Sequence, residues 1–396
     1  TPPLQPHNDT DSMGSCVFQT FPHILFQAGA AASLGELLKS RFAPGRVCIV
    51  TDAFLYRSGL LQPALDSLQR AGWHSLVISD VQADPPDHVV LEITDRARAF
   101  GTELVIGLGG GSSMDVAKLV AVLVSGHQPL DQMYGVDKVQ GQRLPLVQVP
   151  TTAGTGSEVT PIAIVTTGET TKSGIVARQL YADMAVLDAE LTLGLPSAIT
   201  AATGIDAMVH AIEAFTSKRL KNPLSDALAV QALQLLAANL VPACQDGKNV
   251  QAREAMLLGA MLAGQAFANA PVAAVHALAY PLGGVFHLPH GLSNALVLPH
   301  VLRFNAEAAA PHYAALAEAL LPGVQGDHHA KTAAFIRHLQ DLITATGLPM
   351  RLRDHGVDEA SLPRLASDAM QQTRLLINNP REVAEADALA IYQQAY

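Results

Sequence analysis

One carboxylate and three imidazoles in the second half of the chain have the chemistry and the spacing to bind a single divalent metal ion. Asp206 and His210 are four residues apart in an apolar stretch, so a helix would present both on one face. His276 and His290 follow, and the intervening Tyr280-Pro-Leu-Gly-Gly284 is expected to break a helix so that both imidazoles turn inward. Nitrogen and oxygen ligands without a thiolate suit Fe(II), Zn(II), Mn(II) or Co(II). A metal ion held this way can polarise an alcohol or carbonyl oxygen.

These residues also have a purely structural interpretation. The chain holds 15 histidines, so chance spacings are available, and an isolated Asp-x-x-x-His pair is more often a surface or core pair. Glu213, His287 and His300 compete for the ligand role, because Glu213 is one turn after His210 and His287 is close to His290. The metal site therefore needs a second feature in its support.

Two glycine-rich turns, each directly after an apolar run, are that second feature. Leu104–Leu108 predicts a buried parallel strand, which leads through Gly109-Gly-Gly-Ser-Ser-Met-Asp115 into a helical run. A strand, a glycine turn and a helix N-terminus offer free N–H groups to an anion such as a pyrophosphate. Leu146–Val149 leads similarly into Pro150-Thr-Thr-Ala-Gly-Thr-Gly-Ser-Glu158, which predicts a second wall of a nucleotide cleft. Either segment alone could be an ordinary loop.

A further apolar run, Arg46-Val-Cys-Ile-Val-Thr-Asp52, ends in a carboxylate. A carboxylate at this place can accept hydrogen bonds from the adenosine ribose and would repel a 2′-phosphate, which favours NAD over NADP. An aspartate at a strand end is also a common N-cap of the next helix. Both interpretations of Asp52 stay open.

Taken together, the motifs resemble the iron-dependent (group III) alcohol dehydrogenases, from about Phe18 to the last predicted helices. The motifs that carry the resemblance are Gly109–Lys118, Pro150–Glu158, Asp206-x-x-x-His210 and His276-x13-His290-Gly291. The resemblance implies a metal-dependent NAD(H) alcohol dehydrogenase, or an aldehyde or ketone reductase in the opposite direction. Fe(II), with Zn(II) possible in the same ligands, would bind the substrate oxygen and stabilise the alkoxide while hydride passes to the nicotinamide.

The resemblance also implies which residues bind the cofactor. In addition to Asp52, they are Gly110, Gly111, Ser112, Asp115, Thr151, Thr152, Thr155, Lys172 and Leu191. The glycines, Ser112 and Asp115 are expected around the pyrophosphate, and the threonines along the ribose and nicotinamide. Lys172 would bind the nicotinamide ribose, or else be a solvated lysine after the turn Thr167–Thr170. Leu191 is expected to pack along the cofactor.

The chain departs from the common family pattern at Tyr280. Many members carry a histidine there, within His-Ala-x-x-His, whereas this chain has His276-Ala-Leu-Ala-Tyr280. Because tyrosine does not titrate near neutrality without a large perturbation, a proton relay through that position is not expected. Tyr280 is predicted either to hydrogen-bond within the pocket or to pack below the metal. Phe267 is predicted as an apolar wall of the substrate pocket, or as plain core.

The length and texture of the chain predict two domains. Residues 1–195 alternate β-branched runs, such as Val47–Thr51 and Ser75–Ser79, with helical segments, which predicts an α/β dinucleotide-binding domain with a parallel sheet. Residues 196–396 are rich in Ala and Leu with helical periodicity, which predicts an all-α metal-binding and substrate-binding domain. The polar segment Thr1–Ser12 is expected to be a loose tail. A cleft between the domains would bring nicotinamide and metal together.

Composition excludes some classes of partner. Acids outnumber bases by ten and 15% of residues are charged, so neither a nucleic-acid surface nor an anionic-membrane surface is expected. Three scattered cysteines favour a reducing cytoplasm. No apolar stretch is expected to span a bilayer, and no signal peptide is expected. The resemblance implies a homodimer.

Three other functions stay open. A reductase of a carboxylate-bearing carbonyl such as maleylacetate, or a hydroxyacid–oxoacid transhydrogenase, would be favoured by a basic residue in the pocket. A dehydroquinate-synthase-like lyase would need a cluster of Lys and Arg, which the helical half lacks around its ligands. A non-catalytic nucleotide-binding protein is disfavoured by the presence of the ligands together with both glycine turns. The sequence does not name the alcohol.

Overall fold

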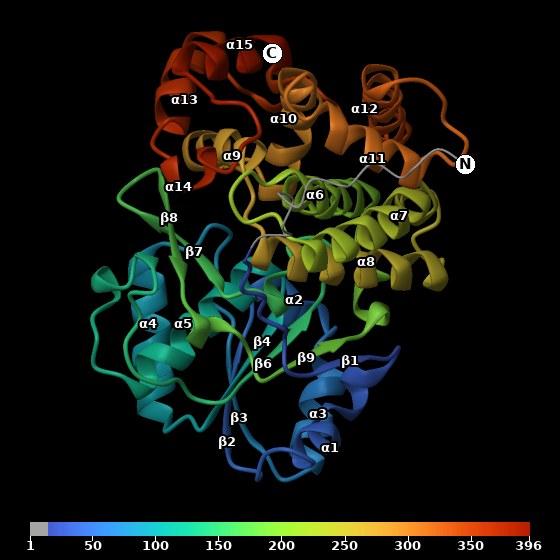
Figure 1. Ribbon diagram of the computed structural model, residues 1–396. Coiled ribbons are helices and arrows are strands. Elements are labelled where there is room, and N and C mark those ends of the chain that lie inside the picture. The colour runs from blue at the N-terminus through green and yellow to red at the C-terminus, as the bar shows by residue number, and fades with distance from the viewer. Residues whose placement is uncertain (1–14) are drawn as a thin grey trace.

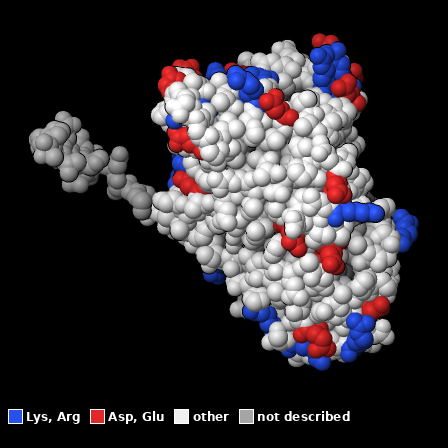
Figure 2. Space-filling model, turned by 90° about the vertical axis from the view of Figure 1, so that its right-hand side faces the viewer, with Lys and Arg blue, Asp and Glu red and all other residues white. Residues whose placement is uncertain are grey.

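The computed structural model describes residues 15–396, so the predicted tail Thr1–Ser12 lies outside the described residues. An α/β part with a parallel sheet is followed by an all-helical part, and the two are stacked one above the other in Figure 1. The predicted fold class is confirmed. Figure 2 shows one broad face on which charged side chains are sparse at the centre and gather towards both ends.

The main sheet has six parallel strands in the order β1-β9-β6-β4-β2-β3. Each of the four strands predicted from the sequence forms within one residue of its expected ends. The strands of this sheet are β1 Ile24–Phe26, β2 Arg46–Val50, β3 His74–Ile78, β4 Leu104–Gly109, β6 Leu146–Pro150 and β9 Met184–Leu187.

Helices cover both faces of this sheet, which explains its continuous apolar runs. In β2, Val47 and Ile49 pack in one apolar cluster with α1 and α3, whereas Cys48 and Val50 pack in a second cluster with α4 and α5. Cys48 is buried. The helices of this part are α1 Leu34–Lys39, α2 Ala53–Ser58, α3 Gln62–Arg70, α4 Asp87–Phe100 and α5 Gly111–Ser125.

A small three-stranded sheet, which the sequence did not predict, lies beside the main one. It contains β5 Gly135–Val136, β7 Ile162–Thr167 and β8 Thr171–Val176. β7 and β8 form an antiparallel hairpin, and Gly168 makes its turn possible because its φ of 62° lies in the left-handed region. The hairpin reaches up to α9 in the helical part.

The order of strands in the main sheet creates a crevice. From β2 the chain runs outward to β3, and it then returns to place β4 on the other side of β2. Ligands of open α/β sheets bind outside the carboxyl ends of the strands at such a switch point. Asp52 follows β2 here, and the turn Gly109–Gly111 follows β4.

The second part of the chain consists of helices packed around α6, whose residues are mostly buried. Its helices are α6 Ser197–Thr216, α7 Pro223–Gln245, α8 Val250–Asn269, α9 Ala274–Phe286, α10 His290–Asn305, α11 Ala310–Leu320, α12 His328–Ala345, α13 Leu362–Ala369, α14 Thr373–Leu376 and α15 Glu385–Ala395. One apolar cluster continues from α5 into α8 and α9, so the two parts share packing, and the domain boundary at 195/196 stays a prediction.

The expected helix break at Tyr280–Gly284 is wrong. α9 continues through Pro281 to Phe286, and it ends where His287 adopts a left-handed conformation with φ 56°. Tertiary packing holds the helix together here, since a Cβ on Gly284 would lie 2.1 Å from the carbonyl oxygen of Thr170. The glycine is therefore needed for close approach to the β7–β8 turn rather than for a break.

The expectation that no apolar stretch could span a bilayer is also wrong in terms of length and composition. Among residues 15–396, α7 is long and apolar enough, and α8 with α9 would pass as a pair bent by 106°. α7 packs against α6, α8, α11 and α12. The core helices of soluble proteins also meet this criterion, which concerns length and composition only.

Close contact between the two parts predicts the effect of a glycine substitution. A Cβ on Gly264 of α8 would lie 2.9 Å from the Cα of Gly156, so Gly264→Ala should destabilise the protein by about 1–3 kcal/mol despite the better helix propensity of alanine. Denaturant unfolding measures the change. Gly194→Ala is the control, because nothing lies within 4 Å of that position. Equal stability of the two variants would refute this packing.

Candidate metal centre and active site

The structure brings Asp206, His210, His276 and His290 together. Each contributes one ligand atom, and these atoms all lie within 4.8 Å of one another. Asp206 and His210 occupy one face of α6, one turn apart, as their spacing predicts. His276 comes from α9 and His290 is the first residue of α10, so three helices converge on one point.

The donor set fits a divalent cation. Nε2 of His210 lies 3.1 Å from Nε2 of His276, and Oδ1 of Asp206 lies 3.4 Å from His210 and 3.5 Å from His290. Oδ2 of Asp206 is buried without a hydrogen-bond partner, which is costly unless something compensates its charge. Nitrogen and oxygen atoms that converge in this way form a site for a borderline transition metal.

The protonation of the histidines also suits a metal ion. Burial lowers the pKa of His210 well below 6.5, and the neighbouring His276 lowers it further. Burial is likewise the largest influence on His290 and lowers its pKa to about 4, although Asp206 opposes the shift. Both imidazoles are therefore neutral at neutral pH, and neutral imidazole is the form that binds metal.

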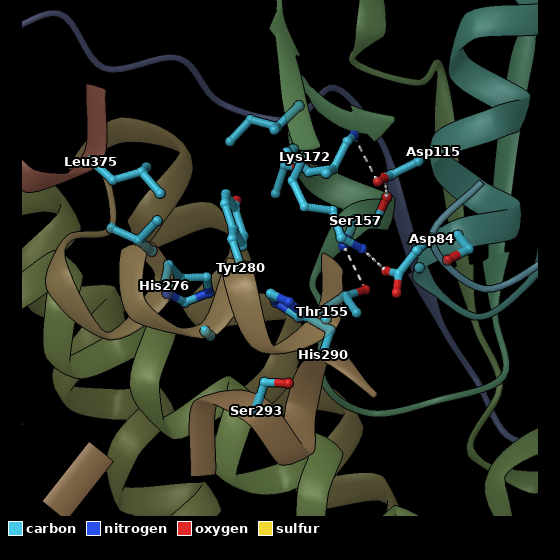
Figure 3. A pocket seen from close by; sticks show the side chains of 18 of the residues that line it. Asp84, Asp115, Thr155, Ser157, Lys172, His276, Tyr280, His290, Ser293 and Leu375 are labelled. Carbon is cyan, nitrogen blue, oxygen red and sulfur yellow. Dashed lines mark hydrogen bonds and ion pairs between the residues drawn. The ribbon is translucent and has the colours of Figure 1, made fainter. Parts of the chain in front are cut away.

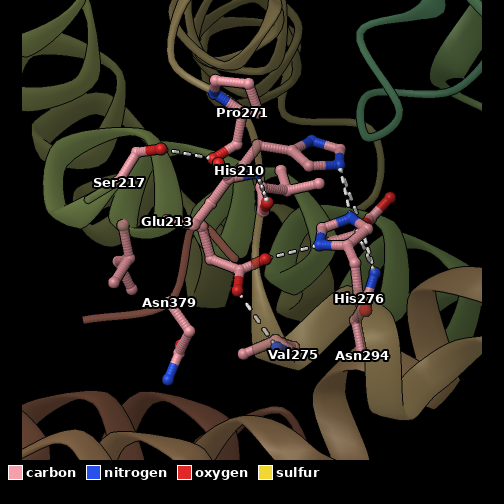
Figure 4. Close-up of polar contacts among 12 residues, drawn as sticks. His210, Glu213, Ser217, Pro271, Val275, His276, Asn294 and Asn379 are labelled. Atoms are coloured by element: carbon pink, nitrogen blue, oxygen red, sulfur yellow. Dashed lines mark hydrogen bonds and ion pairs between the residues drawn. The ribbon is translucent and has the colours of Figure 1, made fainter. Parts of the chain in front are cut away.

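Glu213 supports the site from behind. It was considered as a rival ligand, but its Oε1 lies 2.6 Å from Nδ1 of His276 and its Oε2 accepts a hydrogen bond from the Val275 N–H (Figure 4). A carboxylate on the far nitrogen fixes the tautomer in which Nε2 of His276 offers its lone pair. The sequence signal was present, because Glu213 follows His210 by nearly one turn.

Asn294 is a second supporting residue, which was not predicted from the sequence. Its side chain is fully buried, and its Nδ2 donates a hydrogen bond of 2.6 Å to Oδ1 of Asp206. It follows His290 by four residues on α10, so the same helical spacing that identified Asp206 and His210 could have indicated it.

The other two rival histidines do not join the cluster. His287 is exposed at the end of α9. His300 lies in a separate groove, where its Nδ1 is 2.6 Å from Arg303. Burial, and then Arg303, lower the pKa of His300 to about 4.

A single cavity connects the metal ligands with the glycine turns (Figure 3). It is lined on the helical side by His210, Phe267, His276, Tyr280 and His290. The cofactor side contributes Gly111, Ser112, Asp115, Thr155, Ser157 and Lys172. The cavity therefore joins a nucleotide-type turn and a metal-type ligand set.

Phe267 and Tyr280 both face this cavity. The ring of Phe267 lies 4.3 Å from that of His210, and the ring of Tyr280 lies 6.2 Å from that of His290. Burial raises the pKa of Tyr280, so its phenol stays protonated. Tyr280 lines the cavity, beside the metal ligands. The substrate and catalytic roles of both residues stay predictions.

The two glycine turns contact each other. A Cβ on Gly111 would lie 2.7 Å from Cγ2 of Thr155, so the first turn of α5 fits closely against the second loop. Thr152 lies beside Gly110, and the Thr151 N–H donates to the carbonyl oxygen of Gly109. Ser112 lies in the first turn of α5 and lines the cavity.

Asp115 links these turns through a buried ion pair. Its carboxylate accepts hydrogen bonds from Ser157 Oγ at 2.6 Å and from the Ile164 N–H at 3.1 Å. Lys118, fully buried, lies 3.5 Å from Asp115 and donates to Ser157 and to the carbonyl oxygen of Ile162. Asp115 therefore positions the loop in this structure, and its contact with a pyrophosphate stays a prediction. Lys118 was not predicted as a site residue.

Three further residues that were predicted to bind the cofactor are Lys172, Asp52 and Leu191. Lys172 is buried and forms an ion pair with Asp84 at the cavity wall, so it is not a solvated lysine. Asp52 caps α2 by accepting the Leu55 N–H at 2.9 Å, which is the alternative role considered from the sequence. Leu191 is buried in the apolar cluster with α1 and α3. Their contacts with NAD stay predictions.

Comparison with known proteins agrees with this geometry. Residues 22–189 match the iron-containing alcohol dehydrogenases, and residues 200–396 match the C-terminal region of the Fe-containing alcohol dehydrogenase family. The chain is 40% identical over 395 residues to long-chain-alcohol dehydrogenase 1 of Geobacillus thermodenitrificans, with 97% of each chain covered. It is 36% identical over 389 residues to the sulfoacetaldehyde reductase of Bilophila wadsworthia, covering 95% of this chain and 98% of that one. The solved structure of a 1,3-propanediol oxidoreductase superposes with a TM-score of 0.92 at 34% identity, covering 97% and 100% of the two chains.

A glycine-turn nucleotide crevice that opens onto an Asp/His metal site defines a metal-dependent oxidoreductase. The chain belongs to the iron-containing alcohol dehydrogenase family, and it is an NAD-dependent alcohol dehydrogenase. Its cofactors are NAD and a metal ion. Family membership favours this function over the lyase and the non-catalytic protein.

We expect the affinity for the metal ion to fall when the Glu213 carboxylate that hydrogen-bonds His276 is removed. Glu213→Gln should weaken metal binding by about 10- to 100-fold, because the His276 tautomer and orientation are no longer fixed by a carboxylate. Competition with a chelator measures the affinity, and Glu307→Gln, at an exposed residue of the same part, is the control. Unchanged affinity in Glu213→Gln would show that the hydrogen bond does not act on the metal site.

Proposed function

We propose that the protein binds Fe(II) through Asp206, His210, His276 and His290 and interconverts a primary alcohol and its aldehyde with NAD(H). The observation that carries the proposal is the shared cavity, because the metal ligands and the glycine-turn residues line one space. Zn(II) fits the same ligands. The relatives' names span long-chain alcohols and sulfoacetaldehyde, so the pocket, rather than the family, selects the substrate.

The bound metal ion supplies a positive charge that polarises the substrate oxygen. The chain's own residues do the rest. Glu213 and Asn294 hold the ligand side chains in place. Gly111, Ser112 and Thr155 border the cofactor's side of the cavity, and Lys172 faces the same space with its charge balanced by Asp84. We propose that Lys172 binds the nicotinamide ribose and that the pyrophosphate sits at the N-terminus of α5.

Phe267 and Tyr280 complete the substrate side. The ring of Phe267, against His210, excludes water from the reacting centre. The Tyr280 hydroxyl can donate or accept one hydrogen bond, and its raised pKa means that it orients a water molecule or a ribose hydroxyl without itself transferring a proton. Proton exchange then runs through ordered water.

We also propose that the enzyme works in the cytoplasm as a homodimer, without nucleic-acid or membrane partners. The scattered cysteines support the cytoplasm, the low charge supports the absence of nucleic-acid and membrane partners, and the family resemblance supports the homodimer.

The test is an aldehyde and alcohol panel, with NADH and NADPH, on metal-free protein reloaded separately with Fe(II) and Zn(II). The proposal expects turnover with NADH and a primary aldehyde, and higher activity in the Fe(II) sample. Activity that survives complete metal removal would refute the assigned role of the metal, and higher activity with Zn(II) would refute the choice of iron.

The position of Asp52 leads to a prediction about the preference between NAD and NADP. Asp52→Asn should raise the efficiency with NADP relative to NAD, because it removes a charge that would face the 2′-phosphate while an amide oxygen can still cap α2. Two charges about 4 Å apart near a surface repel by roughly 4 kcal/mol at an effective dielectric of 20. The ratio of kcat/KM values measures the effect, with exposed Asp66→Asn as the control. A preference of the wild type for NADPH that persists in Asp52→Asn would refute this role.

The raised pKa of Tyr280 leads to a prediction about how kcat/KM depends on pH. Because burial raises its pKa, the wild-type profile should lack an essential group that titrates near the unperturbed histidine value of about 6.5. Tyr280→Phe should slow turnover modestly, and Tyr280→His should add a titrating limb. Profiles of kcat/KM against pH measure both, with exposed Tyr56→Phe as the control. A wild-type rate that falls sharply below about pH 6.5, together with an inactive Tyr280→Phe, would contradict this assignment.

A further inference from the structure

We propose that Arg374 binds an anionic group on the substrate, so that the preferred carbonyl compound carries a carboxylate or sulfonate at the end away from the reacting carbon. This inference rests on the proposed function and names the substrate class of the same site.

Arg374 belongs to the wall of the active-site cavity. It lies on the short helix α14, and both Arg374 and the buried Leu375 line the cavity that holds the metal ligands. Figure 3 shows Leu375 on the opposite side of Tyr280 from Thr155 and Asp84.

The structure makes room for the guanidinium. A Cβ on Gly174 of β8 would lie 2.9 Å from an Nη atom of Arg374, so the missing side chain at this position lets the guanidinium lie across the strand. The backbone of Arg374 is fixed by a hydrogen bond from Asn378 to its carbonyl oxygen. The neighbouring Gln372 reaches the carbonyl oxygen of Lys172, which ties α14 to the same strand.

The other basic groups at this cavity already have partners. Lys172 is paired with Asp84, and Lys118, behind the wall, is paired with Asp115. Across residues 15–396, no Asp or Glu forms an ion pair with Arg374, although the side chain is only partly exposed. A guanidinium presents a planar fork of N–H donors that suits carboxylate and sulfonate oxygens. Arg374 is therefore the basic group of this cavity that is available to an anion.

The cavity suits a bifunctional substrate. Arg374 and the metal ligands His210, His276 and His290 line the same cavity, so one ligand can meet both. Ala279 and Val272 add apolar surface to the lining, which suits a few methylene groups between the two ends.

The test compares two aldehydes with the same number of carbons, succinic semialdehyde and butanal, on the metal-loaded enzyme with NADH. The wild type should prefer succinic semialdehyde. Arg374→Met should lower kcat/KM for that substrate by about 10- to 100-fold, mainly through KM, because a charge-assisted hydrogen bond is lost. The same substitution should leave butanal within about twofold, and Arg374→Lys should restore part of the loss. Exposed Arg364→Met is the matched control.

The outcomes separate this inference from the proposed function. Turnover of butanal with equal effects of Arg374→Met on both aldehydes would overturn the anion site and leave the dehydrogenase standing. A wild-type enzyme that turns over no carbonyl compound would refute the proposed function. Calorimetric titration with γ-hydroxybutyrate tests the site without turnover: binding that Arg374→Met abolishes supports it, and binding that ignores this substitution refutes it.

Discussion

The structure depends on placing four metal-ligating side chains, one of them a carboxylate, inside an almost fully buried helix pack. Asp206 is 1% exposed and one of its oxygens lacks any hydrogen-bond partner. Burial of such a charge is unfavourable unless a cation compensates it, so α6, α9 and α10 carry a set of polar atoms that only a bound metal ion satisfies. Glu213 and Asn294 show the same constraint one layer further out, because each satisfies one ligand and holds its orientation.

The second constraint is close approach between the two parts of the chain. Gly156 against Gly264 and Gly284 against Thr170 are contacts in which a Cβ would meet other atoms at 2.9 Å or less. Each contact brings a loop of the α/β part nearer to the helices. The nucleotide crevice and the metal ligands consequently open onto one cavity instead of lying on separate surfaces.

Charges at this cavity divide into two kinds. Asp115 with Lys118, and Asp84 with Lys172, are internal pairs that fix loops and strands around the cofactor side. Arg374 has no such partner among the described residues and lines the same cavity. A buried pair gives the wall its shape, whereas an unpaired guanidinium gives it selectivity, because its charge remains available to a ligand.

Local patterns in the sequence determined the strands, the glycine turns and the four clustered residues, because helical spacing and strand alternation are short-range properties. Packing decided the rest. Pro281 and Gly284 predict a helix break, yet α9 continues through both because Gly284 packs against Thr170. Asp52 and Asp115 were predicted to contact the cofactor. In the structure Asp52 caps α2, and Asp115 accepts a hydrogen bond from Ser157 in the second glycine-rich loop. Arg374 lies 84 residues after His290. No local pattern in the sequence shows that two residues so far apart lie at the same cavity. Only the tertiary structure brings α14 there.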